Sequence, residues 1–338
     1  MTRAPASLPV TGGVPRLVVE GLGVAFDTPR GRVQVVEGVD LSVGAGEAVA
    51  LVGESGCGKS VTAKALLRLL PMPPAHITGG RALLSGEDLL TLPPDALRRA
   101  RGRAVGFVFQ DPMSALNPVY PVGEQIAERL RLHGGLGRRA ARERAAQLLE
   151  QVGIPSATER ARAYPHQLSG GMRQRVVIAI ALACDPTLLI ADEPTTALDV
   201  TIQAQLMALL AEERRARDMG LLLITHDLGL VAQWVDRVVV MYAGQVIESG
   251  SVDSIFHHPR HPYTRGLLQA VPGATPPGPD GRLWSIPGAV PTPDAFPAGC
   301  RFGPRCPRAQ DDCRAAPVVL VDGVRCLHPH TRPIEAAP

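Results

Sequence analysis

The stretch GESGCGKS has the residue types and the spacing of a phosphate-binding loop, G-x-x-x-x-G-K-S. An apolar run, AVALV, precedes it and a helical pattern, SVTAKALLRLL, follows it. Glycines let backbone N–H groups turn toward phosphate oxygens, and the N-terminus of a helix adds partial positive charge. Lys59, one of only two lysines in the chain, suits the β- and γ-phosphates as a compact charge, and Ser60 suits Mg²⁺. The predicted nucleotide contacts are Gly53, Glu54, Ser55, Gly56, Cys57, Gly58, Lys59, Ser60 and Val61.

Two carboxylates, Asp192 and Glu193, end the apolar run TLLIADE. Asp192 at the tip of a strand suits Mg²⁺, either with Ser60 or through water. The alternation of side chains along a strand predicts that Glu193 points the other way, where it would polarise an attacking water. Solvated acids at a strand end are the alternative, and the phosphate loop upstream favours the metal and base roles.

A serine and two glycines, Ser169, Gly170 and Gly171, stand before a long helical pattern in LSGGMRQRVVIAIALACDP. The start of a helix with such residues is a second anion site. It lies too near the Asp192 strand in sequence to serve the phosphates of the first loop, which suggests a site completed by another chain. This stretch resembles the signature motif of ABC ATPases. Met172 stands where that family usually has glutamine.

The remaining marks of the ABC ATPase family follow in order over residues 16–258. The resemblance implies that Gln110 is the Q-loop residue, in contact with nucleotide and Mg²⁺ and active in catalysis, and that Asp199 ends the D-loop. It also implies that His226 is the switch histidine, which contacts the γ-phosphate, and that Phe26 stacks on adenine. Glu193 would be the general base. Two such chains would sandwich two ATP molecules, each between one chain's phosphate loop and the other chain's signature.

Around these motifs the chain alternates short β-rich runs with helical patterns, which predicts an α/β fold. We expect a P-loop (RecA-like) ABC ATPase core over residues 16–258 with an antiparallel β-subdomain and an α-helical subdomain at about residues 111–172. Residues 1–15 would be a disordered lead. Residues 259–338 hold 16 of the 32 prolines and would form an extension that lacks a large core of its own.

The composition excludes some functions. The formal net charge of +3 gives no footprint of nucleic-acid binding. The N-terminus lacks the apolar region of a secretory signal, and the longest apolar run is too short to cross a bilayer. We therefore expect a soluble, cytosolic chain. The resemblance to ABC ATPases implies that it is attached peripherally to the cytoplasmic face of the cell membrane, with two separate membrane permease subunits as partners.

The run QDPMSALNPVYPVGEQIAE resembles the Q-loop region of dipeptide/oligopeptide importer ATPases, and HHPRHPYTRGLLQAVP strengthens that match. The resemblance implies peptide uptake, an extracytoplasmic solute-binding protein, and a second ATPase subunit that is a related or identical chain. Nickel importers share these features, so nickel is an alternative substrate. Two rival interpretations lie outside transport: a soluble ABC ATPase of DNA repair or translation, and a regulatory module without turnover.

Four of the six cysteines, Cys300, Cys306, Cys313 and Cys326, lie near the C-terminus with the spacing C-x5-C-x6-C-x12-C. In the cytosol such clustering favours metal or redox chemistry over disulfides. Structural zinc sites usually show a shorter pair, whereas four cysteines suit an iron–sulfur cluster. Similar extensions of some peptide-importer ATPases are associated with a [4Fe–4S] cluster, and this resemblance favours one here, outside the ATPase motifs and without a role in hydrolysis. Zinc and metal-free thiols stay open as competing interpretations.

Overall fold

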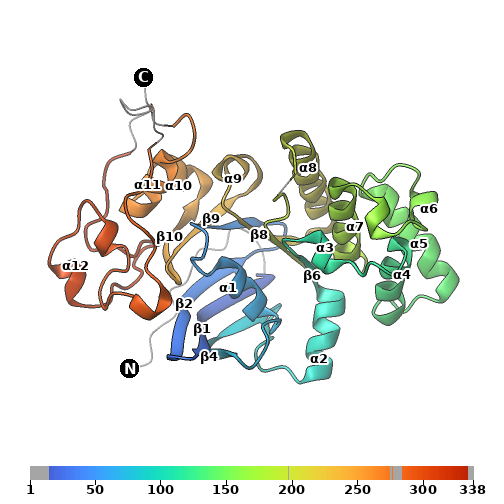
Figure 1. The fold of residues 1–338 in the computed structure, drawn as a ribbon, viewed down its shortest axis with the longest axis horizontal. Coiled ribbons are helices and arrows are strands. Elements are labelled where there is room, and N and C mark those ends of the chain that lie inside the picture. Colours follow the sequence, from blue (N-terminus) through green and yellow to red (C-terminus); the bar gives the residue numbers. More distant parts are fainter. Residues whose placement is uncertain (1–14, 197, 275, 277–283, 334–338) are drawn as a thin grey trace.

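The structure is a computed structural model that describes residues 15–196, 198–274, 276 and 284–333. The predicted disordered lead lies outside these residues except for Pro15. The chain forms an elongated molecule with the α/β core in the middle, helices at one end and the C-terminal extension at the other (Figure 1). Among the described residues, no helix has the length and apolar character needed to cross a membrane.

Two sheets form the core. The first is antiparallel, in the order β2-β1-β4-β5, and its strands are β1 (Leu17–Thr28), β2 (Gly31–Val43), β4 (Ala75–Leu84) and β5 (Glu87–Asp88). The second has the order β10-β9-β3-β8-β7-β6, and its strands are β3 (Ala48–Val52), β6 (Val105–Val108), β7 (Leu188–Asp192), β8 (Gly220–Thr225), β9 (Arg237–Tyr242) and β10 (Gln245–Ser251). All neighbours in the second sheet are parallel except β9 and β10.

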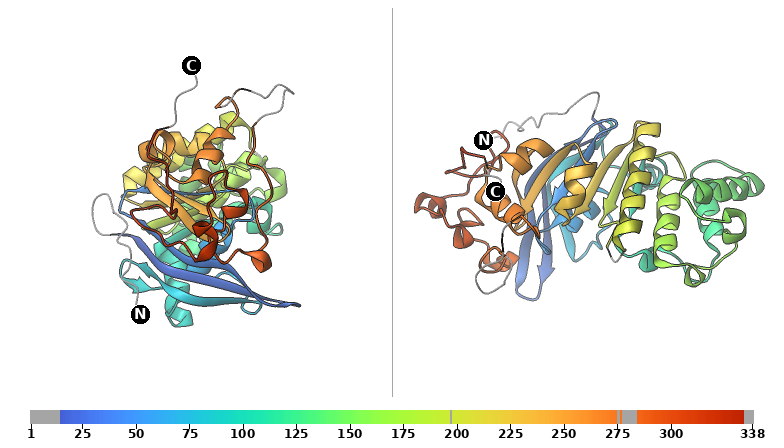
Figure 2. Two further views of the ribbon diagram at one scale, coloured as in Figure 1. Left: turned by 90° about the vertical axis from the view of Figure 1, so that its left-hand side faces the viewer. Right: turned by 90° about the horizontal axis from the view of Figure 1, so that it is seen from above.

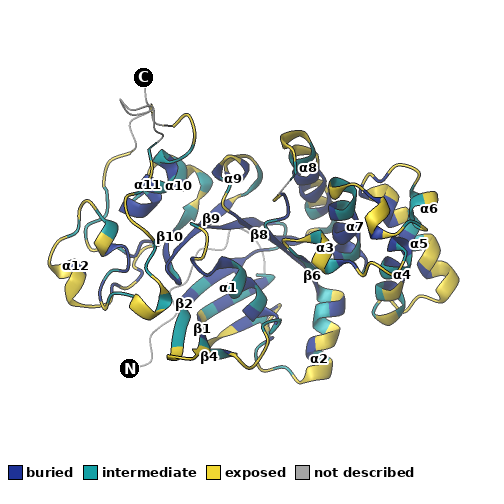
Figure 3. Cartoon of the chain, viewed as in Figure 1, coloured by how far each residue is buried: buried dark blue, intermediate teal, exposed yellow. Residues whose placement is uncertain are grey.

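Strands β3, β7 and β8 are buried along their whole length. Each is a short, continuous apolar run, as expected for parallel strands covered on both faces. Figure 3 shows this burial in the middle of the molecule and exposure at its two ends. The predicted α/β core with an antiparallel sheet and a helical part is thus confirmed.

The helices of more than one turn lie between these strands and after them. They are α1 (Lys59–Leu66), α2 (Pro94–Arg99), α4 (Val122–Leu132), α5 (Arg138–Gln151), α7 (Gly170–Leu182), α8 (Val200–Arg217), α9 (Leu228–Trp234), α10 (Val252–His257) and α11 (Pro262–Gln269). Single turns are α3 (Pro112–Ala115), α6 (Ala157–Arg160) and α12 (Asp312–Ala315), and a π-helical turn spans Ala100–Ala104. Helices α4, α5 and α6 lie together beyond β6, opposite the extension (Figure 2).

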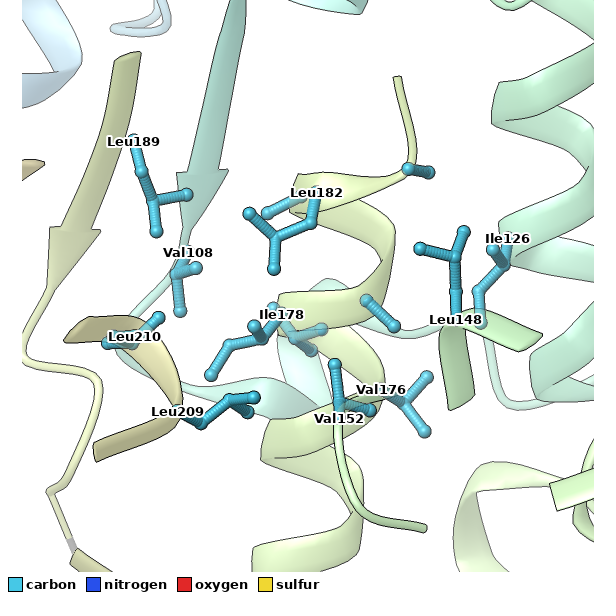
Figure 4. Close-up of a cluster of buried hydrophobic side chains, with 14 of the residues drawn as sticks. Val108, Ile126, Leu148, Val152, Val176, Ile178, Leu182, Leu189, Leu209 and Leu210 are labelled. Carbon is cyan, nitrogen blue, oxygen red and sulfur yellow. The ribbon is translucent and has the colours of Figure 1, made fainter. Parts of the chain in front are cut away.

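One hydrophobic cluster joins the helical end to the large sheet. Helix α7 runs through its centre, and its Val176, Ile178 and Leu182 are almost fully buried (Figure 4). On one side lie Val108 and Leu189 of β6 and β7, and α4, α5 and α8 contribute to the same cluster. Helix α7 is therefore held firmly, and the start of α7 is the predicted signature motif.

The C-terminal extension is not without a core. Phe302 is 2% exposed, and its ring lies 5.3 Å from the ring of Tyr242 on β9 and 5.4 Å from that of Tyr263 on α11. Residues Cys300 and Cys306 pack at the edge of the same cluster. The extension therefore packs against the core of the ATPase sheet through Phe302.

Candidate functional site

Four predicted functional positions follow the carboxyl ends of four neighbouring parallel strands. The phosphate loop follows β3, His226 follows β8, Glu193 follows β7 and Gln110 follows β6, and these strands are adjacent in the order β3-β8-β7-β6. Parallel strands direct their carboxyl ends to one edge of the sheet, where α/β proteins bind ligands. The topology thus brings together residues that are up to 173 positions apart in sequence, from Gly53 to His226.

The phosphate loop has the backbone that its glycines allow. Gly53 has φ 153° and Gly58 has φ 106°. A Cβ atom on Gly53 would lie 2.2 Å from the carbonyl oxygen of Met241, so no other residue fits there. The Lys59 ammonium is buried inside the loop and donates to the carbonyl oxygens of Gly53 at 2.7 Å and Glu54 at 3.0 Å. The loop therefore already folds around the Lys59 ammonium through hydrogen bonds within the protein.

Ser60 and Asp192 form a pair that suits a small cation. The Ser60 hydroxyl donates to Oδ1 of Asp192 at 2.7 Å. Oδ2 of Asp192 is buried and has no hydrogen-bond partner within the described parts of the chain. Burial raises the pKa of this carboxyl, and the Ser60 hydrogen bond opposes the shift. A buried carboxylate oxygen without a partner, next to a hydroxyl, fits the oxygen ligands that Mg²⁺ prefers.

Glu193 is the centre of the predicted catalytic group. Its Oε2 accepts hydrogen bonds from Nε2 of Gln110 at 2.8 Å and from Oγ1 of Thr196 at 3.1 Å. Its Oε1 lies 3.3 Å from Nδ1 of His226. The side chain of His226 is 63% exposed and that of Glu193 is 15% exposed. The structure thus brings Glu193, Gln110 and His226 together, and Thr196 is a contact that the sequence analysis missed.

The orientation of Glu193 has a different cause from the one predicted. Strand β7 ends at Asp192, and Glu193 has φ 48°, in the left-handed region. The turn after the strand, and not the alternation along it, therefore directs the carboxylate. Such a conformation costs about 1–2 kcal/mol for a residue other than glycine. The hydrogen bond from the Glu193 N–H to Ile224 O at 2.9 Å helps to hold it.

The predicted signature lies apart from this group. Ser169 is exposed and caps α7, since its hydroxyl accepts the N–H of Met172 at 3.3 Å. Asp199 caps α8 in the same way, because its Oδ1 accepts the N–H of Ile202 at 2.9 Å. Gly171 lies close to the same isoleucine: a Cβ atom placed on Gly171 would be 3.0 Å from Cγ2 of Ile202. Signature and D-loop are therefore neighbours. Among the described residues, no hydrogen bond or ion pair joins Ser169–Gly171 to the phosphate loop.

Phe26, the predicted adenine contact, lies on β1. Its side chain is half-buried and packs at the edge of the cluster between the two sheets. Its adenine role stays a prediction. Cys57 is 1% exposed in the phosphate loop, and burial raises the pKa of its thiol.

The four C-terminal cysteines line one cavity, together with His261 and Phe302. Backbone N–H groups two or three residues ahead are directed at three of the sulfurs. Phe302 and Gly303 donate to Cys300, Arg308 donates to Cys306, and His328 donates to Cys326. Such hydrogen bonds stabilise negative charge on a sulfur that binds a metal. Burial nevertheless raises the pKa of these thiols, that of Cys326 to about 11, so a cation is needed to hold the thiolates.

The spacing of the sulfurs distinguishes the metals. Four sulfurs around one zinc ion would be about 3.8 Å apart, given a Zn–S distance of about 2.3 Å. Among the described residues, one group of three potential metal ligands has all its ligand atoms within 4.8 Å of each other, and it consists of Asp312, Cys313 and His328. No three of the four cysteine sulfurs form such a group in the described part of the chain. The four sulfurs are therefore spread more widely than a tetrahedral zinc site requires.

Comparison with known proteins shows the family of the chain. The family described as ABC transporter matches residues 36–196, and the one described as oligopeptide/dipeptide transporter, C-terminal region, matches residues 247–313. A "Putative peptide import ATP-binding protein" of Brucella abortus is 51% identical over 327 residues, which cover 93% of this chain and 97% of the relative. The chain belongs to the ABC transporter family. As an ABC protein it is an ATPase.

Further relatives of this ABC ATPase extend the comparison. A protein of the same name from Brucella ovis is 50% identical over 327 residues, covering 93% of this chain and 97% of its own. The dimeric post-hydrolysis state of an ATP-binding cassette bound to ADP and Pi has a TM-score of 0.62 and 27% identity, over 70% of this chain and 98% of that one. A component of an ABC transporter complex from Clostridium perfringens has a TM-score of 0.61 and 28% identity, over 72% and 90%.

Proposed function

We propose that this ABC ATPase powers the import of dipeptides or oligopeptides across the cytoplasmic membrane, working peripherally from its cytoplasmic face. The observation that carries the proposal is the match of residues 247–313 to the C-terminal region of oligopeptide/dipeptide transporters, in the same chain as the nucleotide motifs. The relatives that carry the name of peptide import proteins align over 93% of the chain, so the resemblance includes the extension as well as the ATPase core.

The proposed cycle uses two ATPase chains. Each ATP would lie between the Lys59 loop of one chain and the Ser169–Gly171 signature of the other. Exposure of Ser169 and its separation from the chain's own phosphate loop support this arrangement. Asp192 and Ser60 would hold Mg²⁺, which neutralises phosphate charge, and Glu193 would accept the proton of the attacking water. Closure on ATP and reopening after hydrolysis would be the motion that drives transport.

The proposed partners are two membrane permease subunits, a second ATPase subunit and an extracytoplasmic solute-binding protein. A surface groove supports a docking place for a permease, because it lies beside the Q-loop region, between α4 and the turn at Arg101 and Gly102. Gln125, Arg129 and His133 of the α4 region line it. Two different ATPase chains are the favoured pairing, as in related importers.

Peptide and nickel uptake separate the two candidate substrates. Deletion of this chain in its host is expected to abolish uptake of a labelled dipeptide or oligopeptide and to leave uptake of radioactive nickel unchanged. Complementation with the wild-type chain is expected to restore peptide uptake, and complementation with Glu193→Gln is not, because uptake requires hydrolysis. A defect in nickel uptake alone would transfer the chain to a nickel importer.

Purification from detergent-solubilised membranes tests the non-transport interpretation. A tagged chain is expected to bring down two permease subunits, which mass spectrometry would identify. Recovery with nucleic acid or ribosomes, and without membrane proteins, would favour a soluble ABC ATPase.

We also propose that Cys300, Cys306, Cys313 and Cys326 bind one [4Fe–4S] cluster. Three observations support it: the common cavity, the N–H groups directed at three sulfurs, and a spacing too wide for one zinc ion. The cluster would stabilise an extension in which residues 300–333 contain only short turns of helix.

Anaerobically purified protein is therefore expected to be brown, with broad absorbance in the visible and with iron and acid-labile sulfide. Replacing both Cys306 and Cys313 with serine removes two ligands, so the colour should be lost and residues after Pro259 should become sensitive to protease. Cys184→Ser is the matched control, because Cys184 lies at the end of α7, away from the cavity. Colourless anaerobic protein with stoichiometric zinc, or with no metal, would contradict the cluster.

A further inference from the structure

The C-terminal extension contacts the phosphate loop directly. Arg305 forms a two-pronged ion pair with Glu54, with Nη1 2.7 Å from Oε2 and Nη2 3.1 Å from Oε1. The side chain of Arg305 is 5% exposed and that of Glu54 is 28% exposed. Paired hydrogen bonds of this kind fix orientation as well as distance, and burial protects them from screening. A residue 251 positions away in sequence therefore holds the second residue of the loop.

The extension fixes Arg305 from the other side. Its Nε donates to Pro287 O at 2.9 Å, and Nη2 also donates to Ile286 O at 3.2 Å. Nη1 lies 3.4 Å from the hydroxyl of Tyr242. Arg305 precedes Cys306, so the backbone that carries it belongs to the four-cysteine region. These hydrogen bonds fix the position of the Arg305 guanidinium, and the ion pair then fixes the position of the Glu54 carboxylate.

Glu54 connects this arginine to the lysine of the site. Its backbone N–H donates to the hydroxyl of Tyr263 at 2.9 Å, and its carbonyl oxygen accepts from Nζ of Lys59 at 3.0 Å. Tyr263 is fully buried, with its ring 4.6 Å from that of Tyr242. The side chain and the N–H of Glu54 are therefore both held by residues after position 259, while its carbonyl holds Lys59.

A second arginine of the extension contacts the turn beside the phosphate loop. Arg301, which follows Cys300, donates to Ala243 O and pairs with Glu37, and its guanidinium lies 4.1 Å from the centre of the Phe296 ring. The next residue after Ala243 is Gly244, whose N–H donates to Cys57 O at 2.9 Å. Arg305 therefore contacts the phosphate loop directly, and Arg301 contacts the turn that bonds Cys57 of the loop.

We propose that Arg305 is a positioning residue of the nucleotide site, and that through Glu54 the extension holds the phosphate loop in the shape that binds ATP. The proposal rests on the phosphate loop as the ATP site. A purely structural role of the extension would not predict this result: loss of Arg305 lowers ATP affinity only when Glu54 is present. Arg301 supports the same loop through the turn at Gly244.

The test is a double-mutant cycle on ATP affinity, measured with a fluorescent ATP analogue on the full-length chain. Arg305→Gln and Glu54→Gln are each expected to weaken binding about 10-fold, within the range of coupling between sites. The double variant is expected to bind ATP no more weakly than either single variant, because all three variants lose the same ion pair. At saturating ATP, turnover in the assembled complex is expected to fall much less than affinity. Arg314→Gln is the matched control, an exposed arginine next to Cys313, and is expected to bind ATP normally.

Two measurements separate positioning from loss of folding. Arg305→Gln is expected to melt at a lower temperature than Arg314→Gln, because it loses a buried ion pair, but to stay folded at the assay temperature without nucleotide. Amide exchange at that temperature is expected to rise in residues 53–58 in Arg305→Gln only. If Arg305→Gln does not fold, Tyr263→Phe tests the other contact to Glu54, with a smaller loss of affinity expected. Unchanged affinity in the foldable variants, additive losses in the double variant, or an equal loss in Arg314→Gln would overturn the proposal. Lys59→Ala tests whether the phosphate loop is the ATP site. If this variant still binds ATP, the assignment of the loop is wrong, and the role of Arg305 is not what failed.

Discussion

Replacing Glu193 with glutamine is expected to reduce ATP turnover about 10²–10⁴-fold, the usual contribution of a general base. ATP binding is expected to remain, because the Lys59 ammonium and the loop around it do not involve Glu193. Glutamine keeps one oxygen to accept the hydrogen bonds of Gln110 and Thr196, so the local structure should persist. The amide cannot take a proton from water at neutral pH. The variant should therefore accumulate as an ATP-bound pair of ATPase chains.

Steady-state phosphate release by the assembled complex measures the turnover, and size-exclusion chromatography with MgATP detects the trapped pair. The matched control is Glu212→Gln, an exposed glutamate on α8. It should turn over at the wild-type rate and should not be trapped. Turnover of Glu193→Gln within a few-fold of wild type would remove Glu193 from the role of base and leave the water to another group.

The sequence could predict that the residues of the proposed nucleotide site lie together, because each part of this site is local in sequence. Gly53, Asp192 and His226 all follow apolar runs that form buried strands, and parallel pairing then brings the ends of those strands to one edge. The sequence did not predict the conformation of Glu193. A single left-handed residue has no periodic signature, and only the end of β7 at Asp192 and the turn that follows explain it.

The contact between the extension and the phosphate loop had no sequence signal either. Arginine and glutamate are both common on protein surfaces, so neither Arg305 nor Glu54 stands out in the sequence. Their pairing depends on how the extension packs against the ATPase sheet. The proline content of residues 259–338 gave no indication of the packing of Phe302 and Tyr263 on Tyr242. Long-range packing of a few aromatic rings is invisible to composition and to periodicity.

Ser169→Arg is expected to reduce turnover of the assembled complex about 100-fold, a loss comparable with removal of one transition-state donor. The isolated chain should bind ATP with unchanged affinity, because Ser169 is exposed at the start of α7 and has no contact with its own phosphate loop within the described residues. In the closed pair the bulky side chain would stand where the partner's nucleotide must approach the start of α7. The effect should therefore appear only when two ATPase chains assemble.

The control must separate the loss of the helix cap from the added bulk. Ser169→Ala also loses the hydrogen bond to the Met172 N–H, at a cost of about 1 kcal/mol of stability. Its side chain still leaves room for a nucleotide, so its turnover should fall less than that of the arginine variant, while both melt at similar temperatures. Equal turnover in the two variants would reduce Ser169 to a capping residue. Loss of ATP affinity by the isolated Ser169→Arg chain would place Ser169 in the same-chain site, and the arrangement of two chains around each ATP would then be wrong.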